Sequence, residues 1–239
     1  MDYTISYWNI RLFCYTNAHL INEAKGIILS FTGLGGAQMI SDDPEIAVGF
    51  AEKGIVYIIP YYNPWCWMNR QTVRYVDVLV DIIIEHFGMK EPKIVSTGGS
   101  MGGQCALIYT AYAKVTPTAA ALNCPVCDMP YHYTERPDLP RTMHSAFGGG
   151  EDSLSETIEA ASPLHLAQKA GLPKIKYLVI HCEADTAVNK ERHSDRLTAE
   201  MRNHGYDVTY ITLPGKNHCD LTPEAYAKYY GFAEEALNG

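Results

Sequence analysis

Residues 93–103 read Lys-Ile-Val-Ser-Thr-Gly-Gly-Ser-Met-Gly-Gly, and the apolar run 105–108 follows them. A short β-rich segment that ends in glycines, a single serine, further glycines and a helical pattern form the usual context of the G-x-S-x-G motif. The motif here is Gly98-Gly99-Ser100-Met101-Gly102. Its glycines permit a tight turn that exposes Ser100 at the start of a helix, where the amide of Met101 can stabilise an oxyanion. Taken alone, the motif is equally compatible with a plain glycine-rich turn.

Composition limits the kind of protein that this chain can be. Its 239 residues include 47% hydrophobic and 19% charged residues, which is typical of a globular protein with a single domain over 1–239. The net charge of −8 argues against a nucleic acid or an anionic membrane as partner. No apolar stretch approaches the ~20 residues of a membrane span, and no signal peptide is visible, so we expect a cytoplasmic location. The sequence leaves the oligomeric state open.

Strand and helix patterns alternate along most of the chain. Two continuous apolar runs, 26–31 and 55–60, are typical of strands that are covered on both faces. The alternation predicts an α/β fold with a mostly parallel central sheet and helices on both faces. At the N-terminus, 3–8 and 12–15 predict an antiparallel hairpin at a sheet edge. Further strands are expected at 118–122, 176–181 and 208–213, and helices at 43–53, 71–87, 190–203 and 223–237.

Two irregular segments are candidates for a substrate pocket. Residues 129–161 are rich in Pro, His, Tyr and Gly and predict a short lid-like insertion over the sheet. Residues 61–69 carry four aromatic side chains, which could bind a planar or sugar-bearing ester or could simply close the core. We expect both segments to lie above Ser100. The candidate substrate-binding residues are Tyr61, Trp65, Trp67 and His144.

Two polar residues follow later strands and are candidate partners of the serine. In a parallel sheet, reactive groups gather at the carboxyl ends of the strands, and Asp185 and His218 both lie just beyond such ends. An Asp at this place is commonly a turn former, and a loop His is commonly solvated. Glu183 is a rival acid and His181 a rival base, but both lie at or near the end of a strand, where we expect them to pack against the sheet. The order Ser100, Asp185, His218 nevertheless matches the serine, acid, histidine order of G-x-S-x-G enzymes and favours a catalytic triad.

From about Gly26 to the C-terminus, the chain resembles α/β-hydrolases of the prolyl-oligopeptidase and dienelactone-hydrolase branch. The resemblance implies that Ser100 is the nucleophile, Asp185 the acid and His218 the base. It is carried by the serine motif, by Ala161-Ser162-Pro163, by the segment 181–188, and by Leu213-Pro214-Gly215 through His218.

Several features depart from the pattern of that branch. The chain has no room for the β-propeller of the oligopeptidases or for their acidic clamp on a peptide amino end. Dienelactone hydrolases are similar in size but carry a cysteine where Ser100 stands. After the first buried strand, Thr32-Gly33 replaces the His-Gly of lipases and the tyrosine of oligopeptidases. We therefore expect the amide of Leu34 to be the second donor of the oxyanion hole.

The sequence favours an enzyme that needs no cofactor and no metal. Its histidines are dispersed and form no i, i+4 pair of the kind that zinc hydrolases carry on a helix. Cys124-Pro125-Val126-Cys127 has the spacing of a redox motif but lacks the second pair of a zinc site, which predicts an incidental pair in the pocket wall. The leading interpretation is a serine esterase for small or carbohydrate-linked esters. The alternatives are a compact peptidase or amidase and a catalytically silent binding protein of the same fold.

Overall fold

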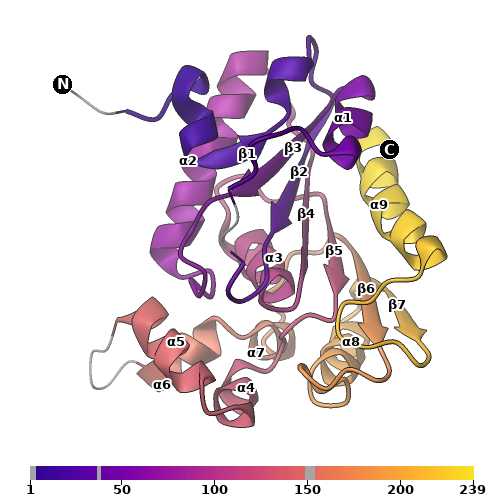
Figure 1. Cartoon of the computed structure of the whole chain (residues 1–239). Coiled ribbons are helices and arrows are strands. Elements are labelled where there is room, and N and C mark those ends of the chain that lie inside the picture. Colours follow the sequence, from indigo (N-terminus) through magenta and orange to yellow (C-terminus); the bar gives the residue numbers. More distant parts are fainter. Residues whose placement is uncertain (1–3, 37–38, 149–153) are drawn as a thin grey trace.

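The continuous apolar runs of the sequence form the centre of a seven-stranded sheet. The structure is a computed structural model that describes residues 4–36, 39–148 and 154–239 (Figure 1). The strand order is β1-β3-β2-β4-β5-β6-β7, and only β1 runs antiparallel to its neighbour. The bounds of the strands are β1 Cys14–Thr16, β2 Gly26–Phe31, β3 Ile55–Pro60, β4 Ile94–Gly99, β5 Ala119–Asn123, β6 Lys176–Cys182 and β7 Asp207–Leu213.

Helices cover both faces of this sheet, which confirms the predicted α/β-hydrolase fold. The buried side chains of α2 (Arg70–Phe87), α3 (Met101–Tyr112) and α8 (Ser194–Asn203) pack in one core cluster. Those of α1 (Glu45–Glu52) and α9 (Pro223–Asn238) pack in a second cluster on the other face. In the part of the chain that the structure describes, no helix combines the length and apolar character needed to cross a bilayer.

The N-terminal segment corrects one prediction. A 3-10 helix, η1 Tyr7–Leu12, replaces the first arm of the expected hairpin, and only β1 pairs with the sheet, antiparallel to β3. A second 3-10 helix, η2 Ala18–Leu20, follows. The Ser6 amide donates to Oδ1 of Asn9 at 2.7 Å, a local bond that fixes the helical turn. The start of the predicted first arm, at residue 3, lies outside the described residues.

Four short helices lie between β5 and β6, where the sequence predicted an irregular insertion. They are α4 Met129–Glu135, α5 Leu139–Phe147, α6 Leu154–Ala160 and α7 Pro163–Gln168. In Figure 1 they lie beyond the carboxyl ends of the central strands, on the side where the chain leaves β4 and β5. Residues 149–153, which include part of the Gly148–Gly150 run, lie outside the described residues.

Candidate active site

The serine motif forms the sharp turn between β4 and α3. Ser100 has φ 58° and ψ −126°, a backbone conformation that residues other than glycine seldom adopt. Such a conformation persists only because the surrounding structure holds it in place. Cβ atoms would not fit at two of the flanking glycines: one at Gly98 would lie 2.2 Å from Gly102 O, and one at Gly102 would lie 2.1 Å from Phe31 O. The glycines therefore allow β4, α3 and the end of β2 to approach closely enough to present Ser100 at the helix N-terminus.

The predicted oxyanion donors lie beside this serine. A Cβ added to Gly33 would be 3.7 Å from Ser100 Cβ, so the loop after β2 runs directly past Ser100. Within the described residues, the backbone amides of Leu34 and Met101 make no hydrogen bond. Unpaired amides near the serine are what an oxyanion hole requires. The Leu34 side chain packs against the core, which holds its amide in this loop.

The structure brings Asp185 and His218 into contact. Nδ1 of His218 lies 2.7 Å from Asp185 Oδ2, and the Asp185 side chain is fully buried. The other carboxylate oxygen accepts the amides of Ala187 and Val188, at 2.8 and 2.9 Å, so the Asp185 side chain is held rigidly in its loop. Glu183 is exposed instead. The geometry thus gives His218 a buried carboxylate that fixes its tautomer and orientation.

His181, the rival base, contacts the Asp185 side of this pair. It is fully buried, its Nδ1 lies 2.6 Å from Ser194 Oγ, and its Nε2 lies 3.2 Å from Asp185 Oδ2 and 3.1 Å from Val188 O. From the sequence, the expected role of His181 is packing against the sheet, and its contact with Asp185 is not predicted. Its position at the end of β6, four residues before the acid, is the signal that could have identified it as a positioning residue for Asp185.

The carboxylate determines the charge state of His218. Burial opposes the charged imidazolium, but the hydrogen bond to Asp185 and the adjacent Cys124 sulfur outweigh it, raising the pKa of His218 to about 9 from its ordinary 6.5. Burial tends to raise the pKa of the Asp185 carboxyl, but hydrogen bonds from His181 and His218 outweigh burial and lower this pKa below its ordinary value. Asp185 is therefore ionised at every pH at which His218 titrates.

This charge balance predicts the pH dependence of hydrolysis. His218 must be neutral to take the serine proton, and its pKa is raised, so kcat/KM should rise with pH and reach half its plateau above pH 6.5, toward about 9. The check is the pH profile of kcat/KM for an ester in the presence of a chelator. An acid limb centred below pH 6.5 would contradict the assigned environment of His218.

The backbone of Asn123, at the end of β5, joins the serine turn to the histidine loop. Its carbonyl accepts the Ser100 amide at 3.0 Å and the Cys219 thiol at 3.6 Å, and its side-chain amide donates to Cys219 O at 3.2 Å. Within the described residues Ser100 Oγ makes no hydrogen bond, and His218 Nε2 lies 3.7 Å from Cys219 Sγ. Catalytic hydrogen bonds are often long or absent without substrate, so the missing Ser100–His218 bond is compatible with a triad of these residues.

The sequence of residues 66–239 matches the prolyl oligopeptidase family, and this match covers well over half of the chain. The chain belongs to the prolyl oligopeptidase family. A search of curated proteins found no match. Membership of this family confirms the resemblance inferred from the serine, acid and histidine segments.

Solved structures agree with the fold of this family member. Thermogutta terrifontis esterase 2 phosphonylated by sarin is 22% identical, with a TM-score of 0.63 over 90% of this chain and 84% of its own. A truncated carbohydrate esterase from gut microbiota is 16% identical, with a TM-score of 0.67 over 95% and 90%. A Mycobacterium tuberculosis puromycin-hydrolyzing peptidase is 18% identical, with a TM-score of 0.67 over 90% of this chain and 34% of its own. At these identities the likeness shows a shared fold.

In this member of the prolyl oligopeptidase family, the aromatic loop and the insertion pack against each other. Trp65 Nε1 donates to Ser145 Oγ at 3.1 Å, and Asn69 Nδ2 donates to Ala146 O at 2.7 Å. Trp65 is only partly buried. The predicted pocket segments are therefore neighbours, and Trp65 is the tryptophan of the pair that keeps an accessible face.

Trp67 corrects the predicted set of pocket residues. It is fully buried in the core, and its Nε1 donates to Thr142 Oγ1 of α5 at 2.9 Å. An aromatic-rich loop does not reveal which ring turns inward, because burial depends on what packs above it. Trp67 thus closes the core under the insertion and does not face a substrate.

Tyr61 and His144, which were predicted to bind substrate, contact other parts of the protein instead. The Tyr61 hydroxyl accepts the Ile40 amide at 3.0 Å, and its ring packs with the α1 and α9 cluster, on the face of the sheet opposite to Trp67. His144 is exposed on α5, and its Nε2 lies 3.1 Å from the Tyr133 hydroxyl. Tyr61 therefore anchors a loop, while His144 is solvent-exposed on α5 beside Tyr133.

The different burial of the two tryptophans gives a testable contrast. Trp67→Ala should lower the free energy of unfolding by about 3–5 kcal/mol, because it leaves a cavity in the core and removes the indole N–H that the Thr142 hydroxyl accepts. Trp65→Ala should cost far less stability and should change the ranking of ester substrates. Denaturant unfolding and rates on several esters check both. Equal destabilisation by the two variants, with the ranking of ester substrates unchanged, would contradict the assignment of Trp67 to the core and of Trp65 to the substrate pocket.

A buried cluster in the insertion fixes α4 to the body of the domain. Nδ1 of His193 accepts the amides of Cys127 and Asp128, both at 3.0 Å, so its proton resides on Nε2 and faces Glu135 Oε2 at 3.1 Å. His132 Nδ1 lies 2.6 Å from the same oxygen. These three side chains have the donor set of a metal site. With both nitrogens of His193 already engaged, their arrangement is better explained as a structural anchor.

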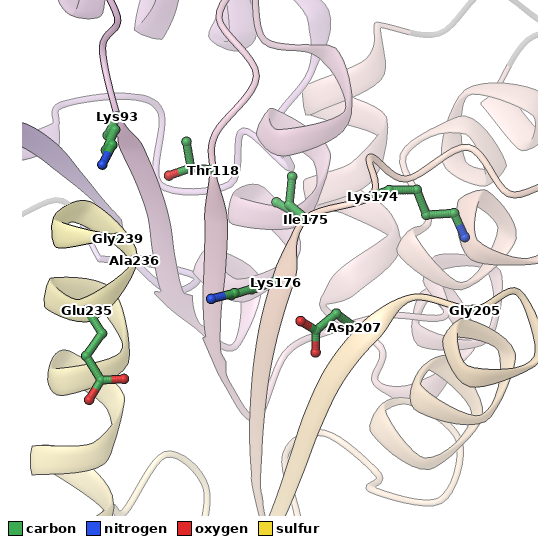
Figure 2. Close-up of a pocket in the computed structure, with 10 residues that line it drawn as sticks. All are labelled: Lys93, Thr118, Lys174, Ile175, Lys176, Gly205, Asp207, Glu235, Ala236 and Gly239. Atoms are coloured by element: carbon green, nitrogen blue, oxygen red, sulfur yellow. The ribbon is translucent and has the colours of Figure 1, made fainter.

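Two hollows lie at opposite ends of the strands of the sheet. One of about 430 Å³ borders the active-site side and is lined by Gly99, Asn123 and Cys219, among others. Another, of about 580 Å³, lies at the amino ends of β4 to β7 (Figure 2). The residues drawn there include Lys93, Thr118, Lys174, Lys176, Asp207 and Glu235. In parallel α/β sheets ligands bind at the carboxyl ends, so the second hollow is not assigned to the reaction.

Proposed function

We propose that this member of the prolyl oligopeptidase family is a serine hydrolase that cleaves carboxylic esters through an acyl-enzyme on Ser100. The observation that carries the proposal is the strained Ser100 turn together with the buried Asp185–His218 pair. A binding protein without activity would gain nothing from backbone strain at a serine. No cofactor is invoked.

In the proposed mechanism, neutral His218 removes the proton of Ser100 Oγ as this oxygen attacks the ester carbonyl carbon. The amides of Met101 and Leu34 stabilise the oxyanion of the tetrahedral intermediate. The imidazolium, held by Asp185, then donates its proton to the departing alkoxide. A water molecule, activated by the same histidine, hydrolyses the acyl-enzyme and restores Ser100.

The proposed substrates are small-molecule esters, including carbohydrate-linked ones. Trp65 supports this choice, because a partly exposed indole offers a flat apolar face beside a polar edge. A carbohydrate esterase is also among the proteins of similar fold. A cytoplasmic location remains a prediction.

The second candidate is a compact peptidase or amidase, which the family match favours. Hydrolysis of p-nitrophenyl esters with acetyl to longer acyl chains, compared with aminoacyl p-nitroanilides, separates the two. We expect turnover of esters and at least tenfold lower kcat/KM on every anilide. A preference for anilides would replace the ester proposal by the peptidase, and no turnover of either class would favour a silent binding protein.

A further inference from the structure

Two thiols flank the histidine that we assign as base, although the proposed hydrolysis uses neither. Cys219 Sγ lies 3.7 Å from His218 Nε2. Cys124 Sγ, Cys219 Sγ and a nitrogen of His218 all lie within 4.8 Å of one another. Two cysteines and a histidine are ligands that tetrahedral Zn²⁺ commonly takes. Bond lengths of about 2.3 Å for Zn–S and about 2.0 Å for Zn–N place a sulfur and a nitrogen ligand about 3.5 Å apart, close to the spacing found here.

The surroundings of these donors resemble the support of a metal site. Metal-binding histidines usually donate their other ring nitrogen to a carboxylate, and His218 Nδ1 has such a contact with Asp185 at 2.7 Å. Cys124 Sγ accepts two backbone amides, from Cys182 at 3.3 Å and from Cys219 at 3.4 Å, which would stabilise a metal-bound thiolate. In the absence of a metal, the hydrogen bond with Cys219 and burial raise the pKa of the Cys124 thiol.

Both cysteines also have unusual backbones. Cys124 has φ 46° and Cys219 has φ 59°, in the left-handed region that residues other than glycine seldom adopt. Such strain persists only where the surrounding structure enforces it, and it concentrates at functional sites. Here it directs two sulfurs from different loops toward one imidazole.

We propose that Cys124, Cys219 and His218 form an inhibitory site for a soft divalent cation such as Zn²⁺ or Cd²⁺. The cation would take the Nε2 lone pair that otherwise accepts the serine proton, while each ligating thiol releases its proton to solvent. Cys127, the second cysteine of the C-x-x-C spacing, is not a ligand. The inhibitory consequence rests on the proposed function, whereas the binding itself does not.

The test is a Cd²⁺ titration of the reduced protein, followed by its thiolate-to-metal absorption and by equilibrium dialysis. We expect one Cd²⁺ per chain with two thiolate bonds. Cys124→Ser and Cys219→Ser should each weaken binding at least about tenfold. Cys127→Ser is the matched control, because this buried thiol donates to Pro125 O at 3.3 Å and is not among the three candidate ligands, and it should bind as the wild type does.

Inhibition is measured separately, with each variant's rate compared with its own metal-free rate. Zn²⁺ should abolish hydrolysis by the wild type, reversibly with a chelator, and should inhibit the two serine variants at least about tenfold more weakly. Absence of a thiolate band in the wild type, or loss of binding in Cys127→Ser alone, would overturn the site. Binding with the expected ligands in a protein that hydrolyses no ester would refute the proposed function and leave the metal site standing.

Discussion

Replacing the serine at the β4–α3 turn should abolish ester hydrolysis while leaving the fold intact. Ser100→Ala removes the attacking oxygen, and the loss of a triad nucleophile lowers kcat by about 10⁴-fold or more. Ser100 Oγ makes no hydrogen bond within the described residues, so its removal breaks no structural contact there. Measurement of kcat together with the thermal unfolding midpoint checks both halves of the prediction.

Ser41→Ala is the matched control for this variant, because Ser41 is exposed and, among the residues that the structure describes, its hydroxyl bonds only to Asp42, at 3.4 Å. It should keep the wild-type rate. Retention of more than a tenth of the wild-type rate by pure Ser100→Ala protein would remove Ser100 from the mechanism.

The second large effect is expected at the acid. Asp185→Asn should lower kcat by about 10⁴-fold, because the amide cannot both accept from His218 Nδ1 and stabilise the imidazolium charge. The carboxylate is buried and accepts two backbone amides through its other oxygen, which an asparagine oxygen can still do. We therefore expect near-native folding, tested by circular dichroism beside the kinetics.

Glu183→Gln provides the comparison, since Glu183 lies two residues earlier in the same loop and is exposed. It should hydrolyse esters at close to the wild-type rate. If Glu183→Gln lost activity and Asp185→Asn kept it, the acid would have been assigned to the wrong residue.

The sheet could be predicted because its strands carry strong local signals. Buried runs such as 26–31 and 55–60, and the glycines around Ser100, demand one backbone arrangement almost independently of their surroundings. Segment 3–15 carried no such signal: its alternating pattern suggested a hairpin, but a bond between Ser6 and Asn9 favours a 3-10 helix. The insertion helices were missed because long-range contacts hold them, such as that of Glu135 with His193.

The candidate site shows the same difference between local sequence signals and long-range packing. Motif and order were enough to propose Ser100, Asp185 and His218 as a triad, since the ends of parallel strands meet at one edge. Tertiary packing decided the rest: Trp67 turned into the core, and Cys219 turned toward the histidine. Neither outcome is encoded in neighbouring residues, because each depends on a partner far along the chain.

Covalent trapping tests the central claim, that Ser100 is the nucleophile, most directly. A fluorophosphonate that modifies activated serines should add once per chain and stop ester hydrolysis in the same proportion. Peptide mass spectrometry should locate the adduct on Ser100, and Ser100→Ala protein should stay unlabelled. An adduct on another residue, such as Cys219, or full inactivation with Ser100 unmodified, would contradict the account.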